Sequence, residues 1–396
     1  MKNFFRISNI YILLWCIYYL QGTLYASGSI ISQGILAILL AISVYYAFYV
    51  NFSLKTPSVI KALNLFVLML TFYGLIYWMS GVVHVTDEGA PVGAIGYLKG
   101  IYISLLPIYA FYAFTAKGLI TDKTIRKWFF VFVAMATVSY FRAEQEALQE
   151  AAMRGSMAEE FTNNTGYTFL ALMPLLFFFN DKKLIQYAGI AYILAFIIMG
   201  MKRGAILIGV IILFWFLYRT LKDATPKMRK RVLLLSVAIL IAGGFFVAHM
   251  LETSEYFQYR LEQTEEGATS GRDVIYSILF SYFINETTPW QFFFGCGANY
   301  TVAVAGNYAH NDWLELAINQ GCLGIIIYMI YWICFYMVWR RSKGHPIIYS
   351  SLGAVLVISF LSTLFSMSYG SMSIYATLCL GDCLTQIGYS SKMINI

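Results

Sequence analysis

Charged side chains are scarce in this sequence. Asp, Glu, Lys and Arg together make up 12% of the 396 residues, and hydrophobic residues make up 60%. Soluble domains carry about 25% charged residues. So little charge cannot cover the surface of a water-soluble particle. The composition, with a mean hydropathy of +0.67, therefore excludes a soluble protein and predicts an integral membrane protein.

Spacings typical of metal sites and disulfide frameworks are also missing. The six cysteines form no Cys-x-x-Cys or Cys/His pair, and the carboxylates do not cluster at ligand spacing. Cys296 stands alone in a loop, and Cys379 and Cys383 are more consistent with small packed hydrophobes. The sequence predicts no metal and no other cofactor.

Long apolar runs fill most of the chain instead. A span needs about 20 apolar residues to cross the hydrocarbon. No internal repeat or low-complexity linker interrupts them, so we expect residues 1–396 to form a single all-α, polytopic membrane domain. We predict about 12 transmembrane helices near 7–26, 30–50, 60–83, 97–116, 125–141, 165–180, 184–201, 204–221, 232–250, 312–338, 347–369 and 371–389.

The charges alternate between the two sides of these spans. With the N-terminus inside, 20 of the 27 Lys and Arg residues fall on the inner side. This bias is the positive-inside rule, so the net charge of +7 reports topology and not nucleic-acid binding. Two outer segments are long. Residues 142–164 are rich in Ala and Glu and predict a surface helix. Residues 251–311 form a loop in which 274–284 and 290–298 predict short interfacial helices.

Seven cations break the inside bias. Lys202 and Arg203 lie between two apolar helices in Met-Lys-Arg-Gly-Ala, where they either anchor a helix end by snorkelling or bind an anion. Gly204 would let a ligand approach the backbone. The outward cations are Lys99, Arg142, Arg154, Lys202, Arg203, Arg260 and Arg272.

The remaining outward arginines are less distinctive. Arg272 lies in Thr-Ser-Gly-Arg-Asp, where it either forms a solvated ion pair with Asp273 or binds an anion. Arg260 stands among five glutamates and ranks below Arg203 and Arg272.

The densest polar pattern runs from 307 to 315 and leads into the tenth span. Asn311 or Asp312 can cap that helix, and Asp312 with Glu315 has capping-box spacing. His310 would then precede a helix N-terminus, which favours anions. Gly321 and Gly324 follow three turns later and allow close helix packing.

The order His-Asn, nine residues, Gly-x-x-Gly resembles the signature of the O-antigen ligase and polymerase family of bacterial membrane glycosyltransferases. The turn from Lys202 to Ala205 resembles the family's Ser-Arg-Gly-Ala turn, with Lys in the Ser position. The resemblance spans most of the chain in architecture and 200–330 in motif. Its other matching residues are Asn163, Asn164, Tyr167, Ser270, Gly271, Arg272, Gly295, Cys296 and Gly297.

The resemblance implies a GT-C-like fold with a long periplasmic loop at 251–311 between spans nine and ten. It also implies transfer of a glycan from undecaprenyl diphosphate to an acceptor hydroxyl at the periplasmic face of the bacterial inner membrane. The acceptor would be lipid A–core for a ligase, or another lipid-linked repeat unit of O-antigen or capsule for a polymerase. A protein-glycosylating relative stays open, and other polysaccharide assembly proteins are possible partners.

The site residues follow from the same resemblance and from the chemistry. We expect His310 to act as acceptor base or orienter, and Arg203 and Arg272, with Lys202 secondary, to bind the diphosphate. Weaker candidates are Arg260, Asn311, Asp312 and Glu315. The alternative function is a lipid-linked oligosaccharide flippase or another secondary transporter, although no repeat pairs the two halves of the chain.

Overall fold

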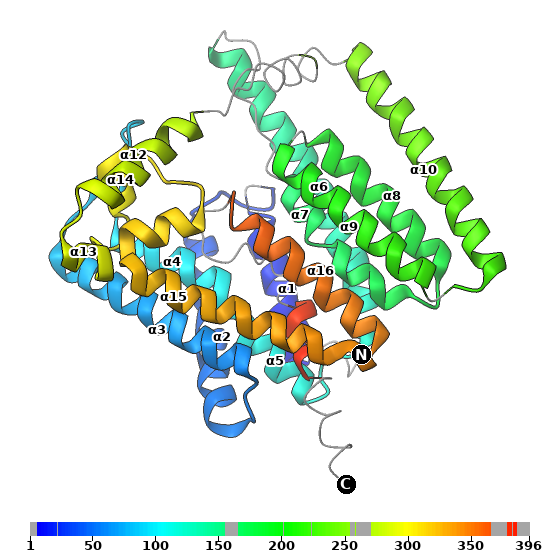
Figure 1. The fold of residues 1–396 in the computed structure, drawn as a ribbon, viewed down its shortest axis with the longest axis horizontal. Coiled ribbons are helices and arrows are strands. Elements are labelled where there is room, and N and C mark those ends of the chain that lie inside the picture. Colours follow the sequence, from blue (N-terminus) through cyan, green and yellow to red (C-terminus); the bar gives the residue numbers. More distant parts are fainter. Residues whose placement is uncertain are drawn as a thin grey trace.

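Helices dominate the structure, a computed structural model that describes residues 6–21, 23–154, 165–200, 202–222, 224–253, 258, 271–365, 378–381 and 383–385 (Figure 1). Two 3₁₀ helices, η1 (Met173–Phe179) and η2 (Ser342–Gly344), accompany the α-helices. The α-helices are α1 (Ile7–Tyr19), α2 (Ile30–Ser53), α3 (Ser58–Ser80), α4 (Ala94–Leu105), α5 (Pro107–Ala116), α6 (Asp122–Arg154), α7 (Thr165–Leu170), α8 (Lys183–Met199), α9 (Arg203–Lys222), α10 (Pro226–Thr253), α12 (Arg272–Asn285), α13 (Pro289–Phe294), α14 (Tyr300–Ala305), α15 (Asp312–Arg341) and α16 (Pro346–Ser362).

Membrane-crossing helices recur along the chain. Among the described residues, five helices are long and apolar enough to span: α2, α3, α4 with α5, α9, and α15 with η2. Shorter apolar helices, α1, α7 with η1, α8 and α16, coincide with other predicted spans. The protein is therefore an all-α, multi-pass membrane protein, as predicted. The count of 12 spans stays a prediction, and most of 371–389 lies outside the described residues.

Two local features differ from the sequence prediction. Residues 142–154 do not form a separate surface helix but continue α6, because 122–154 contains neither Gly nor Pro and its Ala/Glu-rich end favours helix. Arg142 pairs with Glu146 one turn on, which accounts for this outward cation without a ligand. Pro107 interrupts the fourth predicted span, since it has no N–H to continue the α4 ladder and begins α5 instead.

Aromatic side chains fill much of the core. The helices α3 and α15 run side by side (Figure 1), where the Phe66 ring stacks on Tyr328 with centroids 4.8 Å apart. Tyr331 extends this stack. On the other side of the molecule, α16 packs against α9 and η1. The high aromatic content of the chain thus serves core packing.

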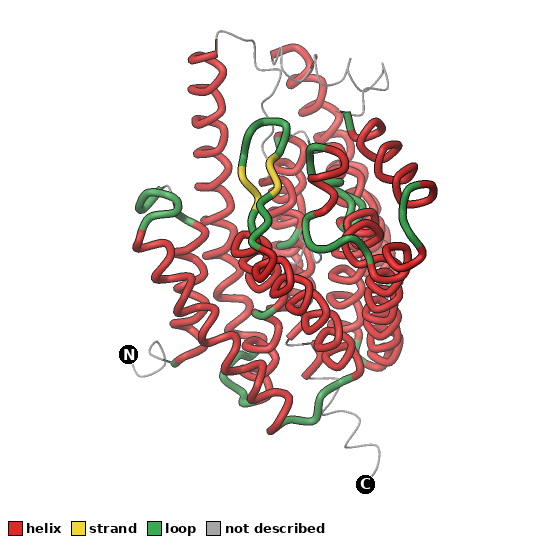
Figure 2. Tube along the Cα trace, turned by 90° about the vertical axis from the view of Figure 1, so that its left-hand side faces the viewer, coloured by secondary structure: helices red, strands yellow, loops and turns green. Residues whose placement is uncertain are grey.

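A small cap covers one end of α3 and α15. It consists of α12, α13, α14 and a hairpin of β1 (His84–Val85) and β2 (Pro91–Val92), which Figure 2 shows as the pair of strands. The hairpin is tied to α14 by Asp87, whose backbone N–H donates to the carbonyl of Gly306 at 2.9 Å. Both short helices predicted in 251–311 are present, as α12 and α13, whereas α14 and the hairpin were not predicted.

The Gly-x-x-Gly pattern marks a kink that the sequence did not predict. Gly321 has φ 64° inside α15, and a Cβ there would lie 2.6 Å from the backbone N of Gly295. The backbone N–H groups of Cys296 and Gly297 donate to the carbonyls of Ile318 and Asn319, at 2.9 and 3.0 Å, where the helix ladder breaks. The Gly-Cys-Gly turn therefore caps the kink.

Gly324 has a different role from the one we expected. A Cβ at this position would meet Gln320 and Leu316 of the same helix rather than a neighbouring helix. The predicted close packing is confirmed for Gly321 alone.

Candidate functional site

His310 lies in the loop between α14 and α15 and has a left-handed backbone, with φ 50°. This conformation costs a residue with a Cβ about 1–3 kcal/mol and clusters at functional sites. It is fixed from both sides. The N–H of Ala309 donates to Glu315 Oε1 at 2.6 Å, and the Asn311 side chain caps α15 by accepting from the N–H groups of Trp313 and Leu314.

Glu315 anchors this loop from within the protein. Its side chain is 2% exposed. Besides the bond to Ala309, Oε2 accepts from Thr301 Oγ1 at 2.7 Å and from Asn319 Nδ2 at 3.1 Å. The predicted capping box of Asp312 and Glu315 is wrong, because Asn311 is the N-cap and Glu315 reaches back beyond it. Glu315 thus holds the backbone of Ala309, next to His310.

Asp312 is fully buried and joins two helices. Its carboxylate accepts from the Tyr328 hydroxyl at 3.0 Å, and its N–H donates to the carbonyl of Thr363 at 2.8 Å. Trp313 Nε1 donates to Thr363 Oγ1 at 2.9 Å. These bonds attach the start of α15 to the end of α16, so Asp312 supports the loop.

Further elements meet at the same end of α16. A Cβ on Gly204 would lie 3.2 Å from the Phe365 ring and would collide with the hydroxyl of Tyr167. The Tyr276 hydroxyl of α12 donates to the carbonyl of Leu364 at 3.5 Å. The space beside Gly204 therefore admits Tyr167 and Phe365, which corrects the expectation of a ligand there. The starts of α7, α9, α12 and α15 all converge on this point.

Positive charge gathers around His310. Burial lowers the pKa of His310, and the charges of Arg272 and Lys202 lower it further. Arg272 also interacts electrostatically with Tyr167. Burial and the two cations therefore favour the neutral imidazole, in which one ring nitrogen can accept a proton. The structure thus brings together His310, Arg272 and Lys202, which are far apart in sequence.

Helix ends add to this positive field. Arg203 and Arg272 are the first residues of α9 and α12, and Asp312 is the first residue of α15. A helix N-terminus carries partial positive charge and unpaired N–H groups, so a cation there opposes the dipole while an anion is favoured. Arg203 is exposed, whereas Lys202 and Arg272 are half-buried. Such an arrangement suits a phosphate-bearing ligand.

Several predicted residues cannot be placed. Arg260, Asn163, Asn164 and Ser270 lie outside the described residues. That Arg203 and Arg272 bind one diphosphate stays a prediction. Thr301 and Thr363 were missed, because each is a common polar residue whose partner lies 14 or 50 residues away. Asn319 was missed too, although its partner Glu315 lies four residues away on the same helix. Across the described part of the chain, no group of three His, Cys, Asp or Glu side chains could hold a metal ion.

The chain was compared with known proteins. A family model described as O-antigen ligase matches residues 188–329. The match runs from α8 into α15 and contains Lys202, Arg203, Arg272 and His310. It supports the family that the sequence motifs resemble and the membrane glycosyltransferase class. No curated protein matches the chain.

Proposed function

Because residues 188–329 carry the O-antigen ligase match, we propose that the protein transfers a glycan from undecaprenyl diphosphate to an acceptor sugar hydroxyl. It acts at the periplasmic face of the bacterial inner membrane, as a polymerase of O-antigen or capsule or as an O-antigen ligase. The acceptor is accordingly a second lipid-linked glycan or lipid A–core. The donor is activated by its own diphosphate, so the reaction needs no nucleotide, metal or other cofactor.

The observation that carries this proposal is the neutral, left-handed His310 beside Arg272 and Lys202. A sugar hydroxyl is a weak nucleophile, and a positioned base accelerates its attack. In the proposed step the acceptor oxygen bonds to the anomeric carbon while the bond from that carbon to the diphosphate oxygen breaks. His310 takes the hydroxyl proton, and the diphosphate leaves with the bonding electron pair.

The leaving group gains negative charge as this bond breaks. Fixed cations and backbone N–H groups stabilise such charge best when they are already in position. Lys202, Arg203 and Arg272 supply the cations, and the starts of α9 and α12 supply the N–H groups. Arg forks bind phosphate oxygens with two parallel hydrogen bonds. We therefore assign these residues to the donor diphosphate and His310 to the acceptor side.

A lipid-linked oligosaccharide flippase is the competing function. A transporter is expected to hold its substrate near the bilayer midplane. Here His310, Lys202 and Arg272 lie at helix ends, where a lipid diphosphate meets water. This position favours the enzyme.

The proposal is tested by transfer in vitro. The purified full-length protein is given an undecaprenyl-diphosphate-linked glycan and a hydroxyl acceptor, and release of the lipid diphosphate is measured together with the coupled product. Wild type should produce both in equal amounts, and His310→Ala should produce much less of each. Translocation of the donor in proteoliposomes without glycosidic coupling would replace the enzyme with the flippase.

The membrane side is tested separately. We expect both termini in the cytoplasm and 251–311 in the periplasm, from the distribution of Lys and Arg. A reporter fused near residue 280 should therefore show periplasmic activity. A cytoplasmic signal at that position would overturn the assignment of the site.

A further inference from the structure

The short helix α13 carries an exposed aromatic surface on the cap. Four of its six residues, Pro-Trp-Gln-Phe-Phe-Phe, are aromatic. Phe292 faces inward and stacks on Phe283 of α12 with ring centroids 4.9 Å apart, whereas Trp290 and Phe293 are 71% and 57% exposed. The rings of Trp290 and Phe294 lie against each other, with centroids 4.2 Å apart. A contiguous exposed apolar surface of this kind marks a contact with protein or with membrane.

The surface of α13 is continuous with the lipid-facing side of α3. The Tyr73 hydroxyl of α3 donates to the carbonyl of Phe294 at the end of α13, and Figure 1 shows the two helices on the same side of the molecule. Beside Tyr73, exposed apolar residues follow one another at helical spacing along α3, at Phe72, Ile76 and Met79. Because α3 is long and apolar enough to cross a membrane, this row of side chains faces lipid.

The contact with Tyr73 fixes the depth of α13. The spanning helix α3 ends at Ser80, seven residues after Tyr73, which is about 10 Å along the helix axis. Its exposed apolar row continues to Met79, past the level at which α13 ends. The end of α13 therefore lies level with the apolar surface of a membrane-crossing helix and not beyond it in water.

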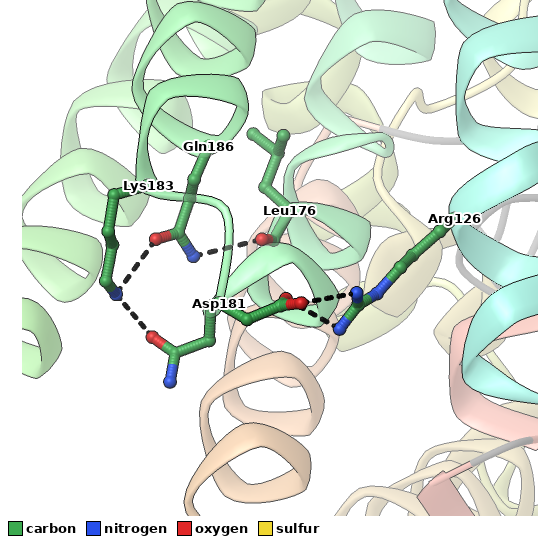
Figure 3. A network of polar contacts seen from close by, with 6 residues as sticks. Arg126, Leu176, Asp181, Lys183 and Gln186 are labelled. Atoms are coloured by element: carbon green, nitrogen blue, oxygen red, sulfur yellow. Dashed lines mark hydrogen bonds and ion pairs between the residues drawn. The ribbon is translucent and has the colours of Figure 1, made fainter.

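Charge distribution separates α13 from the water-exposed connections of the chain. No Asp, Glu, Lys or Arg lies between Glu286 and Asp312. By contrast, the short connection between η1 and α8 contains Asp181 and Lys182, and Asp181 pairs with Arg126 at 2.8 Å (Figure 3). A segment with exposed aromatic rings and no charge is suited to the boundary between lipid and water.

The same helix is connected to the loop that carries His310. A Cβ on Gly321, at the kink of α15, would lie 2.7 Å from the backbone of α13, so the two are in close contact. The 295–297 turn that follows α13 caps the broken ladder at this kink. There Asn319 donates to Glu315, which holds the backbone before His310. A displacement of α13 would therefore reach the His310 loop.

We propose that α13 docks on the lipid bilayer through Trp290 and Phe293, and that this contact keeps the His310 loop in position. The capping box that begins at Thr288 leaves the start of α13 polar, so the helix enters the apolar boundary with its aromatic end. The docking is independent of the transfer reaction, whereas its effect on His310 rests on the proposed function.

The docking is tested with spin labels on the full-length protein in vesicles of phosphatidylethanolamine and phosphatidylglycerol. The label is attached to Trp290→Cys, and wild type is treated in parallel to subtract its native thiols. The matched control is Val85→Cys, which replaces a 56% exposed hydrophobic residue of the hairpin near the charged Asp87 and Glu88. Molecular oxygen concentrates in the hydrocarbon, whereas nickel ethylenediaminediacetate stays in water.

The label at 290 should be more accessible to oxygen, and the label at 85 to the nickel chelate. A preference for the chelate at 290 would place α13 in water and overturn the docking. Low access of both reagents at 290 would mean that protein, such as a second copy of the chain, covers this face, which would overturn lipid as its occupant. An equal oxygen preference at 85 would show an unspecific effect and would overturn it too.

The effect on His310 is tested by the kinetics of transfer in the same vesicles. Phe293→Ser should lower kcat, by up to about 10²-fold, with little change in donor KM, because a small displacement of a catalytic group is costly. Phe293→Leu, which keeps the apolar contact, and Val85→Ser should retain most of the rate. Trp290→Ser replaces Phe293→Ser if the latter does not fold.

The two parts of the proposal can fail separately. An unchanged kcat in Phe293→Ser would overturn the link from α13 to His310. Absence of transfer by wild type would refute the proposed function and with it this link, whereas the spin labels would still decide the docking.

Discussion

The two ends of α9 hold arginine in opposite ways. Arg219, in the last turn, is 8% exposed, bonds to Ser350 and lies over the ring of Tyr349. Arg203, the first residue, is exposed and sits beside Lys202, whose charge reaches His310. A cation is favoured by the dipole at the C-terminal end of a helix and disfavoured at the N-terminal end.

This difference separates packing from recognition. At the Arg219 end the protein itself supplies partners that fix the cation, so its position follows from stability. At the Arg203 end, cations lie at helix N-termini, where the helix dipole disfavours a cation and favours an anion. Proteins retain such unfavourable arrangements where function needs them.

The largest effect should come from His310. His310→Ala should reduce transfer by about 10²–10⁴-fold, the usual contribution of a general base, while donor binding stays nearly intact. The measurement is the transfer rate against pH for wild type and for Ala, Gln and Arg at this position. If His310 only binds diphosphate as a cation, the His310→Arg variant will retain part of the transfer rate, and lowering the pH will raise the rate of wild type. A rate near wild type for Ala would exclude both roles.

Substitutions of two arginines at opposite membrane ends, Arg203 and Arg340, test this comparison directly. Arg203→Lys should lower transfer about 10-fold or more, because a bidentate fork becomes a point charge. Its control is Arg340→Lys in the last turn of α15, at the opposite membrane end, which should transfer normally. Glycan chain length in cells at matched protein levels reports both. If Arg203→Lys and Arg340→Lys lowered transfer equally, the two membrane ends would not differ in function.

Glu315 tests whether the loop must be held. Glu315→Ala leaves the N–H of Ala309, Thr301 and Asn319 without their acceptor, which costs about 1–3 kcal/mol for a buried partner left unpaired. We expect lower kcat with little change in donor KM, and partial recovery in Glu315→Gln. Glu286→Gln, an exposed carboxylate at the end of α12, is the control. Loss of folding without recovery in Gln would make the role purely structural.

The charge of Lys202 should appear in the pH profile. Burial and the two neighbouring cations lower the pKa of His310. As the pH is lowered, the transfer rate of wild type should therefore fall at a pH below about 6.5, the ordinary pKa of histidine. Lys202→Gln removes one cation, which raises this pKa. The variant should therefore lose relative activity first as pH falls towards 6. If the inflection stayed at the same pH in Lys202→Gln, the charge of Lys202 would not act on the pKa of His310.

The smallest effect should come from metal removal. EDTA in detergent should leave the transfer rate unchanged, because the donor carries its own leaving group and Lys and Arg supply the positive charge. A loss that Mg²⁺ or Mn²⁺ restores would show a coordination site that the sequence pattern missed. It would also mean that a metal ion supplies part of the positive charge that we assign to the cations at the Arg203 end.

Local patterns predicted much of the helical arrangement. Apolar runs gave most helix positions within a few residues, and the short pieces inside 251–311 appeared as α12 and α13. They missed local details of individual helices. The predicted span at 97–116 is present as α4 with α5, but Pro107 starts a new helix within it, and the absence of any breaker let α6 continue past 142.

The candidate site was predictable only in its motif residues. His310, Lys202, Arg203 and Arg272 stood out because polar groups are rare in this chain and these cations violate the charge bias. Their supporting residues gave no such signal. Thr363 contacts the start of α15 from another helix, and no spacing rule relates the two.

The sequence by itself determined the membrane class and the presence of a helix N-cap at 311 or 312, because apolar length, charge bias and capping act over a few neighbouring residues. Tertiary structure decided the kink at Gly321 and the closure of its broken ladder by the 295–297 turn. It also decided that Glu315 would clamp Ala309 and that the charge of Lys202 would reach His310. These outcomes depend on hydrogen bonds and Coulomb forces between segments far apart in the chain, whose distances exist only after the helices have packed.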